Sequence, residues 1–181
     1  MQLYDPRFEH DACGVSFVAN VKGVASRAIV EMSLTALCNM AHRGATGAEA
    51  DTGDGAGIVV QIPDGFLRDV VPFSLPPVGT YGVGLAFLST DVEAREKALS
   101  SIEAVVVEEG LAVLGWRDVP TNPECLGSSA RAAMPFVRQL FISDVAHETV
   151  GIDLDRRLFM VRKRIERLPK VDRVLLASIA G

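Results

Sequence analysis

Near the amino terminus the sequence reads Ala12-Cys13-Gly14-Val15-Ser16-Phe17-Val18-Ala19, which places a cysteine at the start of a segment with strand periodicity. Val15, Phe17 and Ala19 would share one face of this strand, because successive side chains of a strand point to opposite faces. A helix is predicted next, with Ser26 as its N-cap and an apolar stripe made of Ile29, Met32, Ala36, Leu37 and Met40. The sequence thus predicts a strand that begins near Cys13, followed by an amphipathic helix.

The triplet His42-Arg43-Gly44 marks the expected end of that helix. Basic side chains in a last turn interact favourably with the helix dipole, and a glycine readily takes the left-handed conformation that closes many helices. A helix stop is therefore sufficient to explain all three residues.

Farther along the chain, short strands and helices are predicted in mixed order, with a loop at 121–129. Thr90 and Glu93 have capping-box spacing and would begin the second helix. The apolar run that ends at Gly181 has no polar tail, as expected of an interrupted strand. The predicted strands are 58–62, 81–88, 111–119, 136–142 and 174–181, and the predicted later helices are 90–110 and 153–167.

Composition narrows the function classes. The chain has 181 residues, of which 49% are hydrophobic and 23% charged, and its 18 basic and 23 acidic side chains give a net charge of -5. This balance is typical of a globular protein and argues against a general nucleic-acid binder. No apolar run is long enough to span a membrane, and no secretory signal is visible. Three cysteines are too few for a disulfide framework, so we expect a protein of the reducing cytoplasm.

Cys13 is the first candidate for chemistry. If the peptide bond before it were cut, Cys13 would carry both a thiol and an α-amino group with a pKa of about 8, which can serve as the base for that thiol. Gly14 would leave room for a substrate carbonyl. The alternative is a small buried hydrophobic residue, as expected for Cys38 inside the helix. Cys125 is expected in a loop, and with no CxxC pair and scattered histidines (His10, His42, His147) no zinc site is expected.

The glycine-rich segment Asp51-Thr52-Gly53-Asp54-Gly55-Ala56-Gly57 leaves five alternatives open. A phosphate loop would need a lysine after the glycines, and none is present. A dinucleotide loop should follow a strand and open a helix, whereas these glycines are followed by a predicted strand. In a calcium loop, Gly53 and Gly55 would occupy positions that need oxygen ligands. The triplet that starts at Asp51 also matches the short motif of aspartic proteases, although polar Asp54 follows it. A tight glycine turn before a buried strand is the simplest explanation.

A basic cluster lies in the last third of the chain. Because apolar residues alternate with these cations, a solvated face of an amphipathic helix is expected rather than a nucleic-acid site. The cluster comprises Arg156, Arg157, Arg162, Lys163, Arg164, Arg167, Lys170 and Arg173.

Together these segments resemble the amino-terminal domain of the large chain of glutamate synthases, a class II glutamine amidotransferase. The similarity lies in 3–15, in 41–48 (Ala-His-Arg-Gly-Ala-Thr-Gly-Ala), in 51–58 and in 156–166, and so covers essentially the whole chain. The resemblance implies an α+β fold of the Ntn-hydrolase type, with four layers (αββα) and antiparallel sheets, incomplete at the carboxyl terminus.

The resemblance also implies a reaction. Residues 1–12 would be a propeptide, and 13–181 the front part of the amidotransferase domain. The Cys13 thiolate would attack the side-chain amide of L-glutamine and form a thioester that water hydrolyses to glutamate, while Arg43 would hold the geometry and charge of the site. The Asp51–Gly57 turn would pack near the same pocket with a structural role. The oxyanion hole and the substrate clamps of the family would lie beyond Gly181, so we expect little activity from this chain alone.

Cofactors and partners follow from the same resemblance. FMN and an iron–sulfur cluster would belong only to the full-length synthase, and this chain would bind neither a cofactor nor a metal. Its partners would be glutamine, the other domains of the large chain and the small chain. Two alternatives remain: a non-catalytic remnant that acts by association with the rest of the synthase, and, least favoured, an aspartic protease that uses Asp51.

Overall fold

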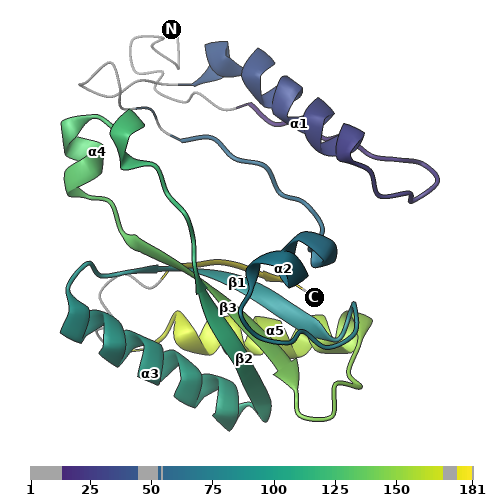
Figure 1. The fold of residues 1–181 in the computed structure, drawn as a ribbon, viewed down its shortest axis with the longest axis vertical. Coiled ribbons are helices and arrows are strands. Elements are labelled where there is room, and N and C mark those ends of the chain that lie inside the picture. The colour runs from purple at the N-terminus through teal and green to yellow at the C-terminus, as the bar shows by residue number, and fades with distance from the viewer. Residues whose placement is uncertain (1–13, 45–52, 54, 169–174, 181) are drawn as a thin grey trace, which may run out of the picture. The chain divides into compact units, whose positions relative to one another are not determined.

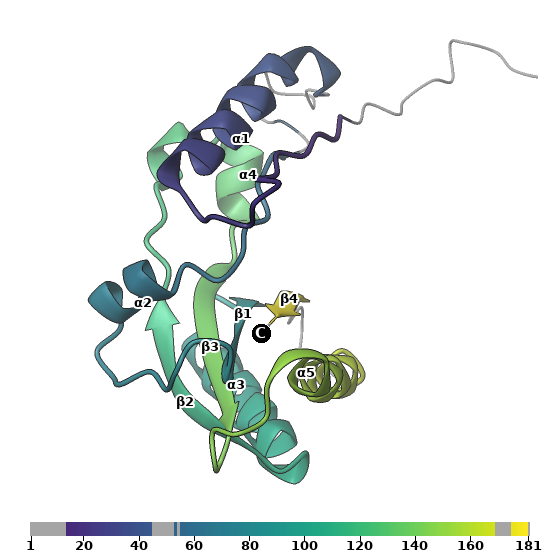
Figure 2. The same ribbon diagram turned by 90° about the vertical axis from the view of Figure 1, so that its right-hand side faces the viewer.

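The computed structural model describes residues 14–44, 53, 55–168 and 175–180, the last of these as backbone only. The chain divides into two compact units. We call residues 1–61 and 123–133 the amino-terminal unit, and residues 62–122 and 134–181 the sheet unit. Figure 1 labels most of the helices and strands of both, and β4 is labelled in Figure 2.

The sheet unit contains one antiparallel sheet of four strands in the order β2-β3-β1-β4. Along the chain, β1 (Tyr81–Leu88), helix α3 (Val92–Glu108) and β2 (Leu111–Asp118) are followed by β3 (Phe136–Asp144), helix α5 (Gly151–Ile165) and β4 (Leu175–Ala180). Each helix therefore connects two strands that are separated by a third strand. This arrangement is the split βαβ topology, in which two such units interlock to form one sheet.

Helices α3 and α5 cover one face of the sheet and enclose the main core (Figure 2). The buried positions of α5 are spaced by four, three and four residues, so they form one stripe on the helix. A methyl group added at Gly82 of β1 would lie only 2.4 Å from Leu158 Cδ1, so the glycine lets α5 pack closely against the sheet. The core residues are Ala86, Leu88, Ala98, Leu99, Ile102, Val105, Val106, Leu111, Leu140, Ile142, Leu154, Leu158, Val161 and Ile165.

A second, smaller core lies where helix α2 (Asp64–Val70) meets the sheet, and it contains Leu67, Leu75, Tyr81 and Phe141. The Tyr81 hydroxyl donates to Asp64 Oδ1 at 2.8 Å, and Arg68 Nε donates to Asp64 Oδ2 at 2.8 Å. The hydrogen bond from Arg68 lowers the pKa of the Asp64 carboxyl, and burial raises the pKa of Tyr81. Helix α2 is thereby tied to the first strand of the sheet.

Most predicted elements of the sheet unit are confirmed. The strands predicted at 81–88, 111–119, 136–142 and 174–181 and the helix at 153–167 are all present with small shifts of their ends. The second helix also forms, but its N-cap is Asp91 instead of Thr90: the Ala94 N–H donates to Asp91 Oδ1 at 2.8 Å. The predicted loop at 121–129 contains the 3-10 turn Pro123–Cys125 and the start of helix α4 (Ser128–Ala132).

In the amino-terminal unit the helix is confirmed as α1 (Arg27–Asn39), but two predicted strands are wrong. Residues 15–19 and 58–62 form no strand in the part of the chain that the structure describes. Their apolar pattern satisfies one requirement of a strand, yet a strand also needs a hydrogen-bonded neighbour. None of the described helices is long and apolar enough to cross a membrane.

Candidate active site

The junction between α1 and the 3-10 turn Ala41–Arg43 is fixed by a dense set of backbone hydrogen bonds. The Met40 N–H donates to the carbonyl groups of Ala36 (3.2 Å) and Leu37 (3.1 Å), and the Arg43 N–H donates to the Met40 carbonyl at 2.8 Å. Gly44 has a φ of -82° and a ψ of 141°, which is extended backbone. The predicted helix stop is thus confirmed, but the predicted left-handed glycine is wrong, because a 3-10 turn already closes the helix.

Gly14 packs directly against this junction. A methyl group added at Gly14 would lie 3.1 Å from Met40 Sδ and 3.2 Å from Arg43 Cβ, which is closer than ordinary van der Waals contact. Gly14, the residue that follows Cys13, is therefore in contact with Arg43, which lies twenty-nine positions farther along the chain. The contact of Met40 with Gly14 was not predicted from the sequence. Met40 belongs to the apolar stripe of the predicted helix, and that pattern indicated only a core residue.

Cys13 itself and Asp51, Thr52 and Asp54 lie outside the described residues. Of the glycine-rich segment, Gly55 has a φ of +99°, a conformation that favours glycine and that agrees with the predicted turn. No residue of 55–63 is helical or in a strand. The described geometry thus joins Gly14 to Arg43 and leaves the role of the glycine-rich turn as a prediction.

The other cysteines lie on the surface. Cys38 of α1 is exposed, so its predicted place in the core is wrong; α1 has no fully buried residue. Cys125 is exposed in the 3-10 turn before α4. Within the described ranges, no three His, Cys, Asp or Glu side chains come together as a possible metal site.

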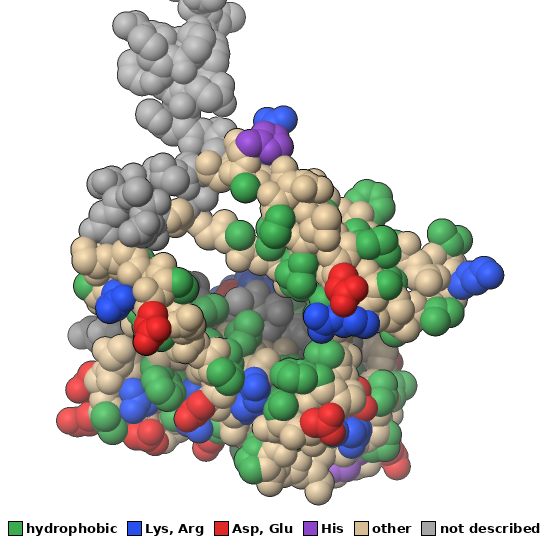
Figure 3. Space-filling model, turned by 45° about the horizontal axis from the view of Figure 1, so that its top comes forward, with side chains coloured by type: hydrophobic (Ala, Val, Ile, Leu, Met, Phe, Trp, Pro, Cys, Tyr) green, Lys and Arg blue, Asp and Glu red, His purple; other side chains and the backbone are tan. Residues whose placement is uncertain are grey.

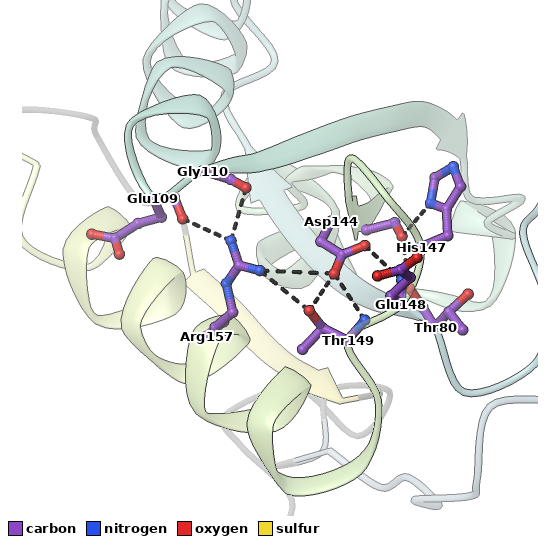
Figure 4. A network of polar contacts seen from close by, with 9 residues as sticks. Thr80, Glu109, Gly110, Asp144, His147, Glu148, Thr149 and Arg157 are labelled. Atoms are coloured by element: carbon purple, nitrogen blue, oxygen red, sulfur yellow. Dashed lines mark hydrogen bonds and ion pairs between the residues drawn. The ribbon is translucent and has the colours of Figure 1, made fainter.

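A second polar cluster lies at the end of β3 and includes a serine–histidine pair (Figure 4). Ser143 Oγ lies 2.7 Å from His147 Nδ1 and donates to the Thr80 carbonyl oxygen at 2.7 Å. A hydroxyl has one proton, so the His147 ring must donate to Ser143 and cannot act as its base. Ser143 is also fully buried. The pair therefore lacks the geometry of a nucleophile and its base.

The remainder of this cluster connects the loop after β3 to α5. Asp144 accepts hydrogen bonds from the backbone N–H groups of Glu148 (3.0 Å) and Thr149 (2.8 Å) and from the Thr149 hydroxyl. Arg157 donates to the carbonyl oxygens of Glu109 (3.2 Å) and Gly110 (2.8 Å), as Figure 4 shows. These hydrogen bonds connect the end of β3 and the end of α3 to α5, so a structural role explains the cluster.

The basic residues of α5 form ion pairs, as expected of a solvated helix face. Arg164 pairs with Glu108, the last residue of α3, and at 2.8 Å with Glu109, which follows it. Arg162 pairs with Glu166 at 2.8 Å. The guanidinium of Arg156, whose side chain is 71% exposed, pairs with Asp153 at 3.1 Å. Lys170 and Arg173 lie outside the described residues.

Apolar side chains are exposed over much of the amino-terminal unit. Val15 is 87% exposed, Phe17 91% and Val59 100%. All three belong to segments 15–19 and 58–62, which were predicted as strands. Hydrophobic side chains are also visible on the face drawn in Figure 3. Met32 and Leu34 of α1 are exposed as well. Exposed apolar area of this kind commonly marks a surface that another segment or protein covers.

Comparison with known proteins identifies the family. The family described as Glutamine amidotransferases class-II matches residues 13–178. The glutamate synthase [NADPH] large chain of Bacillus subtilis (strain 168) is 44% identical over 165 residues, 91% of this chain and 11% of that protein. Ferredoxin-dependent glutamate synthase 1, chloroplastic/mitochondrial, of Arabidopsis thaliana is 40% identical over 171 residues, 91% of this chain and 10% of that protein.

The chain thus spans about a tenth of the length of these curated relatives. The family match begins at Cys13 and includes the whole Gly14–Arg43 contact as well as both helices that cover the sheet. A mixed fold with an antiparallel sheet agrees with it. This chain belongs to the class II glutamine amidotransferases.

Proposed function

We propose that Cys13 is the nucleophile of a glutamine-hydrolysing site. The observation that supports this most directly is the contact of Gly14 with Met40 and Arg43, because it brings the backbone next to the cysteine against the His-Arg-Gly turn. Cys13, Gly14, Met40 and Arg43 all belong to the matched family segment, and the relatives are named as glutamate synthases.

In the proposed reaction, residues 1–12 are first removed, so that Cys13 carries a free α-amino group. This amine accepts the thiol proton, and the thiolate attacks the side-chain amide carbon of glutamine. The carbon–nitrogen bond then breaks, the nitrogen takes a proton and leaves as ammonia, and a glutamyl thioester remains. Water attacks the thioester, which releases glutamate and restores the thiol.

Arg43 is proposed to hold the geometry and charge of the site. A guanidinium remains protonated at all physiological pH values, so it supplies a permanent positive charge. A nearby positive charge favours a thiolate over a thiol and therefore lowers the pKa of a cysteine. The Asp51–Gly57 turn would pack near the same pocket and support its shape.

The rest of the site and of the synthase would come from other segments. We propose that the full domain has the four-layer αββα arrangement, and that the oxyanion hole and the substrate clamps follow the matched region. FMN and iron–sulfur chemistry would belong to other domains, because the amidotransferase match accounts for residues 13–178. The other domains and the small chain of a cytoplasmic synthase would be the partners, with ammonia passing to glutamate synthesis.

Intact mass spectrometry of the purified chain, before and after a glutamine-analogue diazoketone, tests this proposal. A nucleophile at Cys13 predicts loss of residues 1–12 and a single adduct on Cys13, even though the turnover of glutamine by this chain alone should be low. A Cys13→Ser variant should give no adduct, whereas Cys38→Ser, which removes an exposed thiol of α1, should react like the unmodified chain. An adduct on Cys38 or Cys125 in place of Cys13 would contradict the proposal.

A second candidate is a non-catalytic chain that acts by association with the rest of a synthase. The observation that favours it is the exposure of Val15 (87%), Phe17 (91%) and Val59 (100%). The same mass measurement separates the two: an unprocessed and unlabelled chain supports the associating chain, and a processed, labelled chain supports the enzyme.

A further inference from the structure

Helix α5 has a second stripe of side chains on the side that points away from the sheet. Each position of this outward stripe comes two residues before a buried position of the same helix, and two residues turn an α-helix by about 200°, so the two stripes lie on opposite sides. The outward stripe comprises Ile152, Arg156, Phe159 and Lys163, and the buried stripe comprises Leu154, Leu158, Val161 and Ile165. The outward stripe thus has the same spacing as the stripe with which α5 packs on the sheet, and such spacing suits a second helix as its neighbour.

The outward stripe combines exposed apolar side chains with cations. Ile152 is 63% exposed and Phe159 53%, and Met160, beside the stripe, is 50% exposed. The side chains of Arg156 and Lys163 are 71% and 42% exposed. Because α5 already packs against its own sheet through the buried stripe, these apolar side chains are not needed for the core. Exposed apolar area of this kind commonly marks an interaction surface.

The cations of the outward stripe can take partners outside the helix. Arg156 pairs with Asp153 at 3.1 Å, but both side chains are more than two-thirds exposed, and such exposed pairs contribute little. The guanidinium can therefore turn to another partner at small cost. The Phe159 ring already attracts one cation, since Lys163 Nζ lies 5.7 Å from its centre. The stripe thus carries both the cations and the ring of a cation–π contact.

We propose that the outward stripe binds the same stripe of a second copy of the chain, with the two α5 helices antiparallel. In this orientation one stripe is reversed against the other, so Arg156 lies opposite Phe159 of the second copy, and Lys163 lies opposite its Ile152. Each cation then meets an apolar side chain, and the Arg156 guanidinium can stack on the aromatic ring. A parallel pair would place each cation against its own counterpart, and like charges oppose that arrangement. The dimer is independent of the proposed reaction.

The stripe is short, so the dimer should be weak. From Ile152 to Lys163 the helix rises only about 16 Å. Two such faces bury less than the roughly 1,200 Å² at which stable interfaces begin. We therefore expect reversible association with a Kd on the order of 100 µM.

Sedimentation velocity of the full chain, from about 10 µM to about 1 mM, tests the inference. We expect monomer at the low end of this range and mostly dimer at the high end. Phe159→Lys puts a second cation opposite Arg156 of the second copy and should raise Kd about tenfold or more. Phe159→Glu puts a carboxylate there, so it should raise Kd by no more than about threefold. In a parallel pair both variants would set like charges against each other, so equal losses would contradict the antiparallel dimer.

Two controls make the comparison specific. Phe17→Lys changes a 91% exposed phenylalanine of the amino-terminal unit and should leave Kd unchanged. Trp116 packs against the main core, so an unaltered urea transition of its fluorescence in Phe159→Lys shows that the sheet unit is intact. If Phe159→Lys does not fold, Arg156→Glu replaces the exposed cation that faces the ring and should also raise Kd about tenfold.

Two results would overturn the proposal. One is a chain that stays monomeric up to about 1 mM. The other is a dimer that Phe17→Lys weakens and that Phe159→Lys and Arg156→Glu leave unchanged, because the exposed apolar residues of the amino-terminal unit would then mediate the association.

Discussion

Asp144, at the end of β3, is a carboxyl group whose pKa the folded structure lowers. The hydrogen bond from the Thr149 side chain, followed by backbone hydrogen bonds from the same loop, lowers the pKa of this carboxyl, and burial opposes the shift without reversing it. The folded state therefore favours the carboxylate more than the unfolded state does. Its stabilising contribution is complete above the unfolded pKa of about 3.9 and is lost as the pH falls through the lower folded pKa.

The Asp144→Asn variant should lose about 1–3 kcal/mol of unfolding free energy near pH 7, because an amide cannot accept the same set of charge-assisted hydrogen bonds. The difference from the unmodified chain should narrow as the pH falls below about 4, since protonation then weakens the original carboxyl as well. Urea unfolding followed at a series of pH values measures both effects.

Asp69→Asn, which alters an exposed carboxylate of α2, is the control and should change the stability little at any pH. A difference between Asp144→Asn and the unmodified chain that stays constant from pH 7 to pH 3 would show that the charge of Asp144 plays no part.

At the scale of residues, the sequence indicated which residues are candidates for the site better than it indicated which residues they contact. Cys13 and Arg43 were marked as candidates by residue type and family resemblance, and the structure brings Gly14 and Arg43 together. The contact with Met40 Sδ could not be predicted, because it depends on how a loop packs on a helix end. The exposure of Cys38 was missed for a related reason: an apolar helix pattern indicates a face but does not supply the element that covers it.

At the scale of elements, the start of α3 shows which of two adjacent polar residues caps a helix. The Asp91 side chain accepts from the Ala94 N–H at 2.8 Å, and Thr90, one position earlier, contributes its carbonyl oxygen to Arg95 at 3.2 Å. Asp91→Ala should therefore cost about 1 kcal/mol of stability, and Thr90→Ala should cost much less. Urea unfolding monitored by circular dichroism compares the two, and a greater loss in Thr90→Ala would restore the capping box that the sequence predicted.

Strands were predicted correctly where another segment of the chain forms a hydrogen-bonded neighbouring strand. Four predicted segments found neighbours in the sheet, with pairs such as Tyr81↔Ser143 that are far apart in sequence. Segments 15–19 and 58–62 have comparable apolar patterns but no strand neighbour within the described residues. Periodicity thus predicts which face of a strand would be buried, whereas the pairing order β2-β3-β1-β4 depends on non-local contacts that a single sequence does not reveal.

At the scale of the molecule, the two units differ in how much core each contains. Both hydrophobic core clusters belong to the sheet unit, whereas α1 of the amino-terminal unit has no fully buried residue. The single tryptophan, Trp116, packs against the main core, so its fluorescence reports on the sheet unit. A stable unit needs its own buried apolar surface, and by this criterion the sheet unit should fold without residues 1–61.

Deletion of residues 1–61 should therefore leave the urea transition of Trp116 fluorescence within about 0.5 kcal/mol of that of the full chain. Leu158→Ala in the full chain, which removes a fully buried side chain of α5, should lower the same transition by about 2–5 kcal/mol. Loss of a cooperative transition on deletion, or a shift as large as that of Leu158→Ala, would mean that the sheet unit depends on the amino-terminal unit. A retained transition would place the stability of this chain in the split βαβ sheet and its proposed chemistry in the less buried segment that contains Gly14 and Arg43.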